Sequence, residues 1–287
     1  MNIKQSLEHG IKILRENNID EAILKTKILL SYALNKNKEY LITHEQEELT
    51  EKVINKYNSY ITRIKNNEPI QYITQRQEFM GLSFLVNEDV LIPRPDTEIL
   101  VEEVLNIIKV EQKNKVLDLC TGSGAIGISI AKYVQNAKVT LLDISNKALK
   151  VAKVNYINNI LPVESSRIKI IKSNLFSEIN EQNKFDIIVS NPPYIKTSVI
   201  YTLEKQVQKE PLIALDGGAQ GLDIYKKIIK EAYKYLVDDG YLCLEIGYDQ
   251  KEQIIKLIKN TKKYNNIYSK KDLAGNDRIV ICKKEEN

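Results

Sequence analysis

A glycine-rich turn follows the apolar segment VLDLC (116–120) and precedes an apolar stretch with helical spacing. Its glycines are Gly122, Gly124 and Gly127. Glycine lets the backbone turn sharply and lets a ligand approach the N–H groups of a helix N-terminus, which have no intrahelical partner. Asp143 ends the next apolar segment, where a carboxylate can accept hydrogen bonds from both hydroxyls of an adenosine ribose. Together these features predict a pocket for an adenosine-containing cofactor.

The glycines also satisfy the spacing G-x-G-x-x-G, so a dinucleotide-binding oxidoreductase is one alternative and a plain tight turn is another. Asp118, four residues before Gly122, argues against the oxidoreductase, because a carboxylate there would repel the pyrophosphate of a dinucleotide. At this position it resembles the first motif of class I methyltransferases that use S-adenosyl-L-methionine (SAM). In those enzymes the carboxylate lies near the cationic amino-acid end of the cofactor, and we therefore expect Asp118 to contribute to a SAM site.

The tetrapeptide Asn191-Pro192-Pro193-Tyr194 follows another apolar segment, FDIIVS (185–190). The prolines fix φ and stop the strand, so the carbonyl directions are set before a ligand arrives. An amide or aromatic amine nitrogen is a poor nucleophile, but it is held for attack when its N–H groups donate to fixed acceptors. The Asn191 side-chain oxygen and the Pro192 carbonyl are two such acceptors. Tyr194 adds an aromatic wall and a cation–π contact of roughly 1 kcal/mol to a sulfonium.

Strand and helix patterns alternate from residue 97 to the C-terminus. Apolar strand patterns are found at 116–120, 138–143, 167–172, 185–190, 241–247 and 278–284. Helical patterns are found at about 97–109, from 124, and at about 146–158, 220–236 and 250–260. Strands that are apolar on both sides and alternate with helices predict an α/β fold with a doubly wound, mostly parallel sheet. The carboxyl edge of its first strands is the expected ligand site.

The first 70 residues have helical spacing of apolar residues and predict a small bundle. Thr43 and Gln46 form a plausible capping box for a long helix through Lys65. The basic and acidic side chains of the bundle nearly cancel, so we expect it to face a protein and not a polyanion. Residues 71–95 read as a β-hairpin linker with Gly81 in the turn.

The chain as a whole resembles the HemK/PrmC family of N5-glutamine methyltransferases, which modify the Gly-Gly-Gln motif of peptide chain release factors. The resemblance rests on the helical N-terminal part, LIPRPDTE (91–98), the 118–127 loop, Asp143, the Asn191–Tyr194 segment and LAGNDR (273–278). It implies a Rossmann-like, seven-stranded class I methyltransferase domain at 96–287, a substrate-docking domain at 1–70 and the linker at 71–95. The implied partner is a release factor.

The resemblance also implies roles for individual residues. Asp143 would bind the ribose, and Asn174 would lie beside the adenine. The methionine part of SAM would be surrounded by Cys120, Thr121, Gly122, Ser123 and Gly124. Asn191, Pro192, Pro193 and Tyr194 would hold the substrate glutamine, with Asn191, Pro192 and Tyr194 acting in catalysis and Asn191 also touching SAM. No metal is expected.

Two positions depart from the family pattern: Cys120 replaces the usual glycine, and Asn174 replaces a frequent aspartate. Cysteine keeps the loop if its φ is negative, and Asn174 can still accept a hydrogen bond from the adenine amino group. For Arg94 and Glu98, a role in the site and an ion pair that braces the linker are equal alternatives.

The net charge of +4 comes from lysines spread along the chain, with only two histidines and three separated cysteines. This composition favours a reduced cytoplasmic protein without a stable nucleic-acid partner, an export signal or a membrane span. We expect a monomer. The remaining alternatives are an adenine-N6 DNA or guanine-N2 RNA methyltransferase, because exocyclic amines need the same geometry, and a non-catalytic SAM-binding protein.

Overall fold

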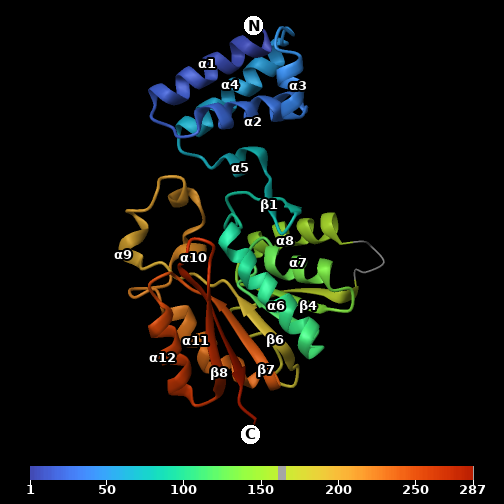
Figure 1. Ribbon diagram of the computed structural model, residues 1–287, viewed down its shortest axis with the longest axis vertical. Coiled ribbons are helices and arrows are strands. Elements are labelled where there is room, and N and C mark those ends of the chain that lie inside the picture. Colours follow the sequence, from blue (N-terminus) through green and yellow to red (C-terminus); the bar gives the residue numbers. More distant parts are fainter. Residues whose placement is uncertain (161–165, 287) are drawn as a thin grey trace. The chain divides into compact units, whose positions relative to one another are not determined.

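The computed structural model describes residues 1–160 and 166–286, which divide into two compact units (Figure 1). The smaller unit contains residues 1–75 and 204–209, and the larger unit contains residues 76–203 and the chain from 210 onward.

The smaller unit is helical, as predicted. Its helices are α1 (Ile3–Glu16), α2 (Ala22–Leu34), α3 (Lys38–Thr43), α4 (Glu51–Lys65) and α5 (Ile70–Thr74). Apolar side chains at three and four spacing meet in one core that includes Leu14, Leu29 and Ile64. The predicted start of the long helix at Thr43 is wrong, because Thr43 is the last residue of α3. The long helix is α4, which begins at Glu51 and ends at Lys65 as predicted. The N-cap of α4 is Thr50, whose hydroxyl accepts from the Val53 N–H at 3.4 Å.

A short hairpin opens the larger unit and confirms the predicted turn at Gly81. Strands β1 (Gln77–Phe79) and β2 (Leu82–Phe84) pair antiparallel. Met80 and Gly81 turn with φ of +50° and +64°. The Glu98 carboxylate accepts from the Met80 N–H at 2.6 Å, so Glu98 braces this hairpin through a backbone hydrogen bond and not through an ion pair.

A seven-stranded sheet forms the centre of the larger unit and confirms the predicted α/β fold. Its order is β5-β4-β3-β6-β7-β9-β8. The strands are β3 (Lys115–Leu119), β4 (Lys138–Asp143), β5 (Ile168–Lys172), β6 (Phe185–Ser190), β7 (Leu236–Glu245), β8 (Tyr264–Lys271) and β9 (Asp277–Lys284). Strands β5, β4, β3, β6 and β7 run parallel, and β9 is antiparallel to both of its neighbours. Strand β8 was not predicted, because this edge strand is largely exposed and rich in Asn and Lys.

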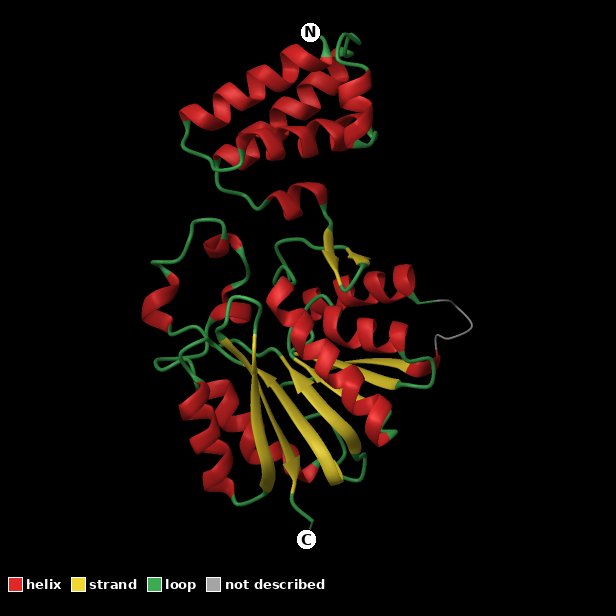
Figure 2. Ribbon diagram, viewed as in Figure 1, coloured by secondary structure: helices red, strands yellow, loops and turns green. Residues whose placement is uncertain are grey.

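Helices cover both faces of the sheet (Figure 2). One face packs against α6 (Glu98–Glu111), α7 (Ala125–Tyr133) and α8 (Asn146–Asn159). The other packs against α11 (Asp223–Glu231) and α12 (Lys251–Thr261). Successive residues of a strand point to opposite faces, so Val116 joins the first core and Leu117 the second. By the same alternation Asp118 faces α7. The predicted helix at 220–236 is shorter, because the chain already enters β7 at Leu236.

The segment between β6 and α11 has little regular structure. It contains two short helices, α9 (Thr197–Ile200) and α10 (Leu212–Leu215). Ile195 bridges to Asp216 in parallel, so the segment folds back beside its own start. This arrangement places Ile213 at the same edge of the sheet as the ends of β4 and β6.

Candidate functional site

Three polar side chains lie at the carboxyl edge of the parallel strands. Asp143 is the last residue of β4, Asn191 follows β6 directly, and Glu245 is the last residue of β7. A pocket at this edge lies within the larger unit. It is lined by Asp89, Val90, Leu91, Leu119, Cys120, Gly122, Leu142, Asp143, Ile144, Ser145, Ala148, Ser173, Asn174, Leu175, Asn191, Pro193, Ile213, Ala214 and Ile224. The carboxyl edge is where open α/β sheets bind nucleotide-type ligands.

The glycines of the loop after β3 serve two different needs. Gly122 has φ +54°, and a Cβ built on it meets no atom within 4 Å, so the loop is open toward the pocket there. A Cβ on Gly124 would lie 2.6 Å from Ile128 Cδ1, and one on Gly127 would clash with Leu141. Gly122 therefore gives a ligand access to the backbone. Gly127 allows α7 to pack closely on the sheet, and Gly124 leaves room for Ile128 and for Ala152 of α8.

Asp118 lies beneath the loop and is fully buried. Its Oδ2 accepts from the Thr121 hydroxyl at 2.5 Å and from the Gly127 N–H at 3.0 Å, while Oδ1 is buried without a hydrogen-bond partner. Burial raises the pKa of Asp118 to about 7, although both hydrogen bonds lower it. Asp118 thus fixes the loop from below and is not among the residues that line the pocket.

Asp143 lines the pocket at the end of β4. Its Oδ2 accepts from the Gly122 N–H at 2.9 Å, and its Oδ1 accepts from the Ser145 N–H at 2.8 Å. Burial raises the pKa of this carboxyl, and hydrogen bonds from the backbone N–H groups of Ser145, Gly122 and Ile144 oppose that rise. The carboxylate is therefore held in one orientation between the glycine loop and the start of α8.

The structure brings together only part of the residue set predicted from the sequence. Cys120, Gly122, Asp143, Asn174, Asn191 and Pro193 line the pocket. Asp118, Thr121, Ser123, Gly124, Pro192 and Tyr194 do not. Some of these residues support the wall from behind: Thr121 binds Asp118, and the Ser123 carbonyl accepts from the buried Asn155 amide at 2.9 Å.

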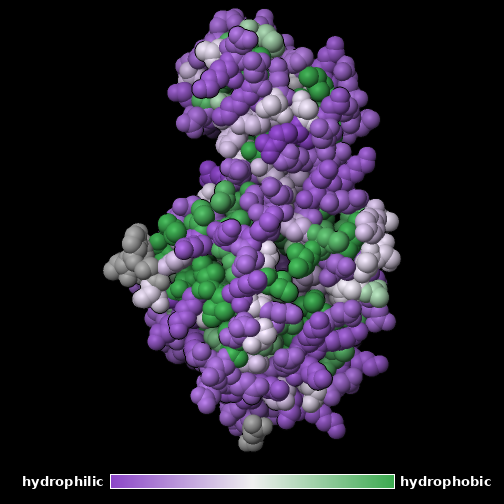
Figure 3. All heavy atoms as spheres, turned by 180° about the vertical axis from the view of Figure 1, so that it is seen from behind, coloured by the Kyte–Doolittle hydropathy of each residue, from purple (hydrophilic) through white to green (hydrophobic). Residues whose placement is uncertain are grey.

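The apolar lining of the pocket was not predicted from the sequence. Val90, Leu91, Ile144, Leu175 and Ile213 all contribute to it. Ile144 had a usable signal, because it directly follows the acidic residue that ends β4. The others approach from distant segments. Hydrophobic side chains also gather on the face of the larger unit that is visible in Figure 3.

The condition under which Cys120 would keep the loop without strain is not met. Its φ is +58°, in the left-handed region, and not negative. The chain needs this conformation to turn from β3 into the loop, and a side chain makes it unfavourable by about 1–2 kcal/mol. Burial raises the pKa of the Cys120 thiol to about 12, so the thiol stays protonated.

Cys120→Gly is therefore expected to stabilise the protein. Glycine removes the left-handed strain but loses more backbone entropy on folding, so the net gain in the free energy of unfolding is about 0.5–1 kcal/mol. Urea denaturation of both proteins measures this difference. Lower stability of the variant would show that packing of the thiol outweighs the strain.

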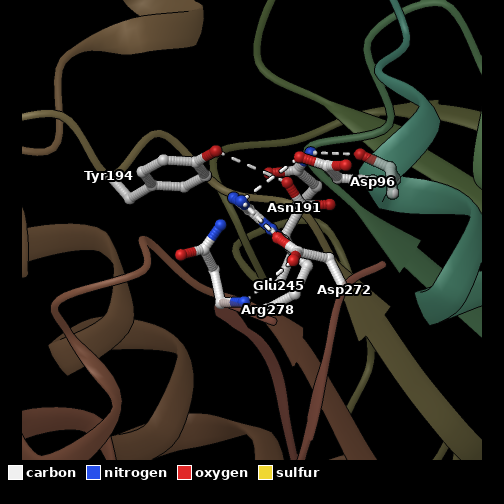
Figure 4. Close-up of polar contacts among 8 residues, drawn as sticks. Asp96, Asn191, Tyr194, Glu245, Asp272 and Arg278 are labelled. Carbon is white, nitrogen blue, oxygen red and sulfur yellow. Dashed lines mark hydrogen bonds and ion pairs between the residues drawn. The ribbon is translucent and has the colours of Figure 1, made fainter. Parts of the chain in front are cut away.

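The Asn191–Tyr194 segment is held by side chains from three other elements (Figure 4). Asn191 Nδ2 donates to Thr97 Oγ1 at 3.3 Å, so the acceptor oxygen of this amide is the end that remains for a ligand. The Tyr194 hydroxyl donates to Glu245 Oε1 at 3.4 Å, and Gln250 Nε2 donates to the Tyr194 carbonyl at 3.0 Å. The turn that the prolines stiffen is thus fixed from outside as well.

Two ion pairs anchor the segment that carries Thr97. Arg94 pairs with the buried Glu210, which also accepts from the Ile92 N–H at 2.9 Å. Asp96 lies 3.2 Å from Arg278. These contacts agree with a bracing role for Arg94.

The described residues contain neither a candidate metal site nor a candidate membrane-spanning helix. Residues 1–160 and 166–286 contain no group of three or more His, Cys, Asp or Glu side chains arranged to bind a metal ion. Within the same residues, no helix combines the length and the apolar character needed to cross a membrane.

Comparison with known proteins agrees with this geometry. Residues 95–210 match the family model described as "Methyltransferase small domain", and residues 5–74 match "PrmC N-terminal domain". Among solved structures, the catalytic domain of hMettl16 in complex with MAT2A 3'UTR hairpin 6 has a TM-score of 0.59 at 16% identity. The match covers 77% of this chain and 83% of that one, and it shows the fold alone.

Curated relatives match over the full length. "Release factor glutamine methyltransferase" of Clostridium acetobutylicum is 44% identical over 98% of this chain and 98% of the relative. The protein of the same name from Clostridium botulinum is 40% identical over 99% of this chain and 100% of the relative. A fold, a glycine loop and an Asn-Pro-Pro-Tyr segment thus coincide with full-length similarity, and the chain belongs to the HemK/PrmC family of release factor glutamine methyltransferases.

Proposed function

We propose that this protein transfers a methyl group from SAM to the side-chain amide nitrogen of the glutamine in the Gly-Gly-Gln motif of peptide chain release factors. The observation that carries the proposal is the rigid Asn191–Tyr194 segment beside a pocket of nucleotide-binding type. Full-length similarity to relatives named for this activity supports it.

The residues of the pocket fit SAM. Asp143 offers a fixed carboxylate for the ribose hydroxyls, and the open backbone at Gly122 leaves room for the methionine part. Asn174 and Ile144 line the pocket and offer a polar group and an apolar wall for the adenine. When bound, SAM supplies a methyl group activated by its sulfonium.

The protein's own residues position the acceptor nitrogen. The Asn191 oxygen and the Pro192 carbonyl accept hydrogen bonds from the glutamine amide, while Pro193 and Tyr194 wall its planar group. The amide nitrogen forms the new N–C bond, and sulfur leaves with the electron pair of the broken C–S bond. One N–H proton then passes to solvent. Orientation of this kind can lower the activation barrier by up to about 7–11 kcal/mol.

The remaining parts of the proposal concern partners and location. Residues 1–70 dock the release factor, residues 71–95 link the domains, and residues 96–287 catalyse the transfer. We place the protein in the cytoplasm as a monomer without a stable nucleic-acid partner. Its cysteines are free, as the reducing cytoplasm requires, and its charge is spread along the chain.

The test is methyl transfer from labelled SAM to a purified release factor, with duplex DNA and ribosomal RNA assayed in parallel. We expect label only in the release factor, and peptide mass spectrometry should locate it on the glutamine of the Gly-Gly-Gln motif. Label in nucleic acid would favour an adenine-N6 or guanine-N2 methyltransferase. SAM binding without transfer to any of the three would favour a non-catalytic SAM-binding protein.

A further inference from the structure

A buried carboxylate lies directly behind the Asn191–Tyr194 segment and has no role in the function derived above. Glu245 ends β7, and only 1% of its surface is exposed. Its Oε1 accepts from the Tyr194 hydroxyl, whereas its Oε2 is buried without a hydrogen-bond partner. Figure 4 shows Glu245, Tyr194 and Asn191 drawn together at this edge of the sheet.

Glu245 is also without an ion pair, although an arginine lies nearby. Arg278 pairs with Asp272 at 2.8 Å and with Asp96 at 3.2 Å. In the described part of the chain, no cation lies within ion-pair distance of Glu245. A buried charge without a partner is costly, and an apolar or amide side chain of similar size would stabilise the fold better. The cost is explained if the charge meets a cation that the bound substrates bring to the site.

Such a cation arises in methyl transfer. Before transfer the sulfonium carries the positive charge, and after transfer the amide nitrogen carries it until the N–H proton leaves. A fixed negative charge in a site of low dielectric stabilises a cation far more than the same charge does in water.

We propose that ionised Glu245 is a positioning residue for methyl transfer, which orients Tyr194 through its hydroxyl and stabilises the positive charge at the reacting centre. The inference rests on the proposed function for the identity of the acceptor, but not for the presence of SAM.

The charge of Glu245 depends on pH near neutrality. Burial raises its pKa to about 7, although a hydrogen bond with the Thr97 side chain and the positive charge of Arg278 lower it. The other titratable groups that face it are Asp96, Tyr194 and Tyr225, whose hydroxyl donates to the Glu245 carbonyl at 2.7 Å. Because the ionised form is the active one, kcat should fall as the pH drops through the pKa of Glu245.

The test compares wild type with Glu245→Gln, which keeps the shape and loses the charge. We expect kcat to fall by about 30-fold and the fall of kcat at acid pH to disappear. The effect is smaller than the roughly 10²–10³-fold loss for one preorganised donor, because the sulfonium already carries the positive charge before transfer. The melting temperature should not drop.

A second measurement needs no methyl acceptor. Because the charge favours the sulfonium over the neutral thioether, the preference for SAM over S-adenosylhomocysteine, taken from the two Kd values, should fall by about threefold or more in Glu245→Gln. Failure of the wild type to methylate release factor would contradict the proposed function, whereas this binding ratio would still test Glu245.

The matched control is Glu103→Gln. Glu103 on α6 is also a buried carboxylate that accepts from a tyrosine at 2.7 Å. Its partner Tyr268 lies on β8 and not in the Asn191–Tyr194 segment, and Glu103 also pairs with Lys270. We expect this variant to keep the fall of kcat at acid pH and the preference for SAM over S-adenosylhomocysteine. An unchanged kcat, an unchanged fall of kcat at acid pH and an unchanged binding preference in Glu245→Gln would overturn the proposal and leave Glu245 a purely structural residue.

Discussion

Asn191→Ala is expected to lower kcat for glutamine methylation by about 10³-fold while the Kd of SAM changes by less than about threefold. The structure fixes the nitrogen end of this amide on Thr97, so the oxygen end is set to accept from the substrate. Alanine removes that acceptor, and the substrate amide then loses the orientation that the transition state requires. Single-turnover kinetics with saturating SAM, together with calorimetric binding of SAM, measure the two effects separately.

Asn174→Ala serves as the control for this first prediction. Asn174 lines the same pocket together with its neighbours Ser173 and Leu175, but it does not belong to the Asn191–Tyr194 segment. Its loss should weaken SAM binding and leave kcat at saturating SAM nearly unchanged. A loss of SAM affinity in Asn191→Ala equal to its loss of turnover would contradict the proposed role of Asn191.

Asp143→Ala is expected to raise the Kd of SAM by about 100-fold, because two charge-assisted hydrogen bonds to the ribose hydroxyls are lost at about 1.5 kcal/mol each. At saturating SAM, kcat should stay within about threefold of wild type, since the acceptor nitrogen is held elsewhere. Isothermal titration with SAM and a full kcat determination check both statements. An unchanged Kd would remove Asp143 from the ribose site.

Asp143 also holds the backbone, so its variant needs a control for stability. Asp186 is a carboxylate of similar role outside the pocket: it accepts from the Asn114 N–H at 3.1 Å and the Lys115 N–H at 2.8 Å. Asp186→Ala should lower the melting temperature through the loss of these two bonds and leave the Kd of SAM unchanged. Weakened SAM binding in this control as well would indicate that general destabilisation causes the effect.

The sequence by itself determined the architecture and pointed to the family. Burial on both sides of a strand and burial on one side of a helix leave different periodicities, and the strands at 138–143 and 185–190 were predicted with the bounds that the structure has. Glycine and proline restrict the backbone locally, so the turn at Gly122 and the stiff segment at Asn191 were also readable. The edge strand β8 was not, because it is too exposed to show an apolar pattern.

Only the tertiary structure decided which side chains share the site. Strand order places β7 beside β6, and this brings Glu245 behind Tyr194, although nothing in the sequence near Glu245 distinguishes it from other acidic residues. Chain folding likewise brings Ile213 and Val90 to the pocket from distant segments. The left-handed backbone of Cys120 also follows from its surroundings, since the turn out of β3 imposes a conformation that a cysteine does not prefer. Local patterns report local burial and backbone freedom, whereas contacts between distant segments depend on how the sheet is assembled.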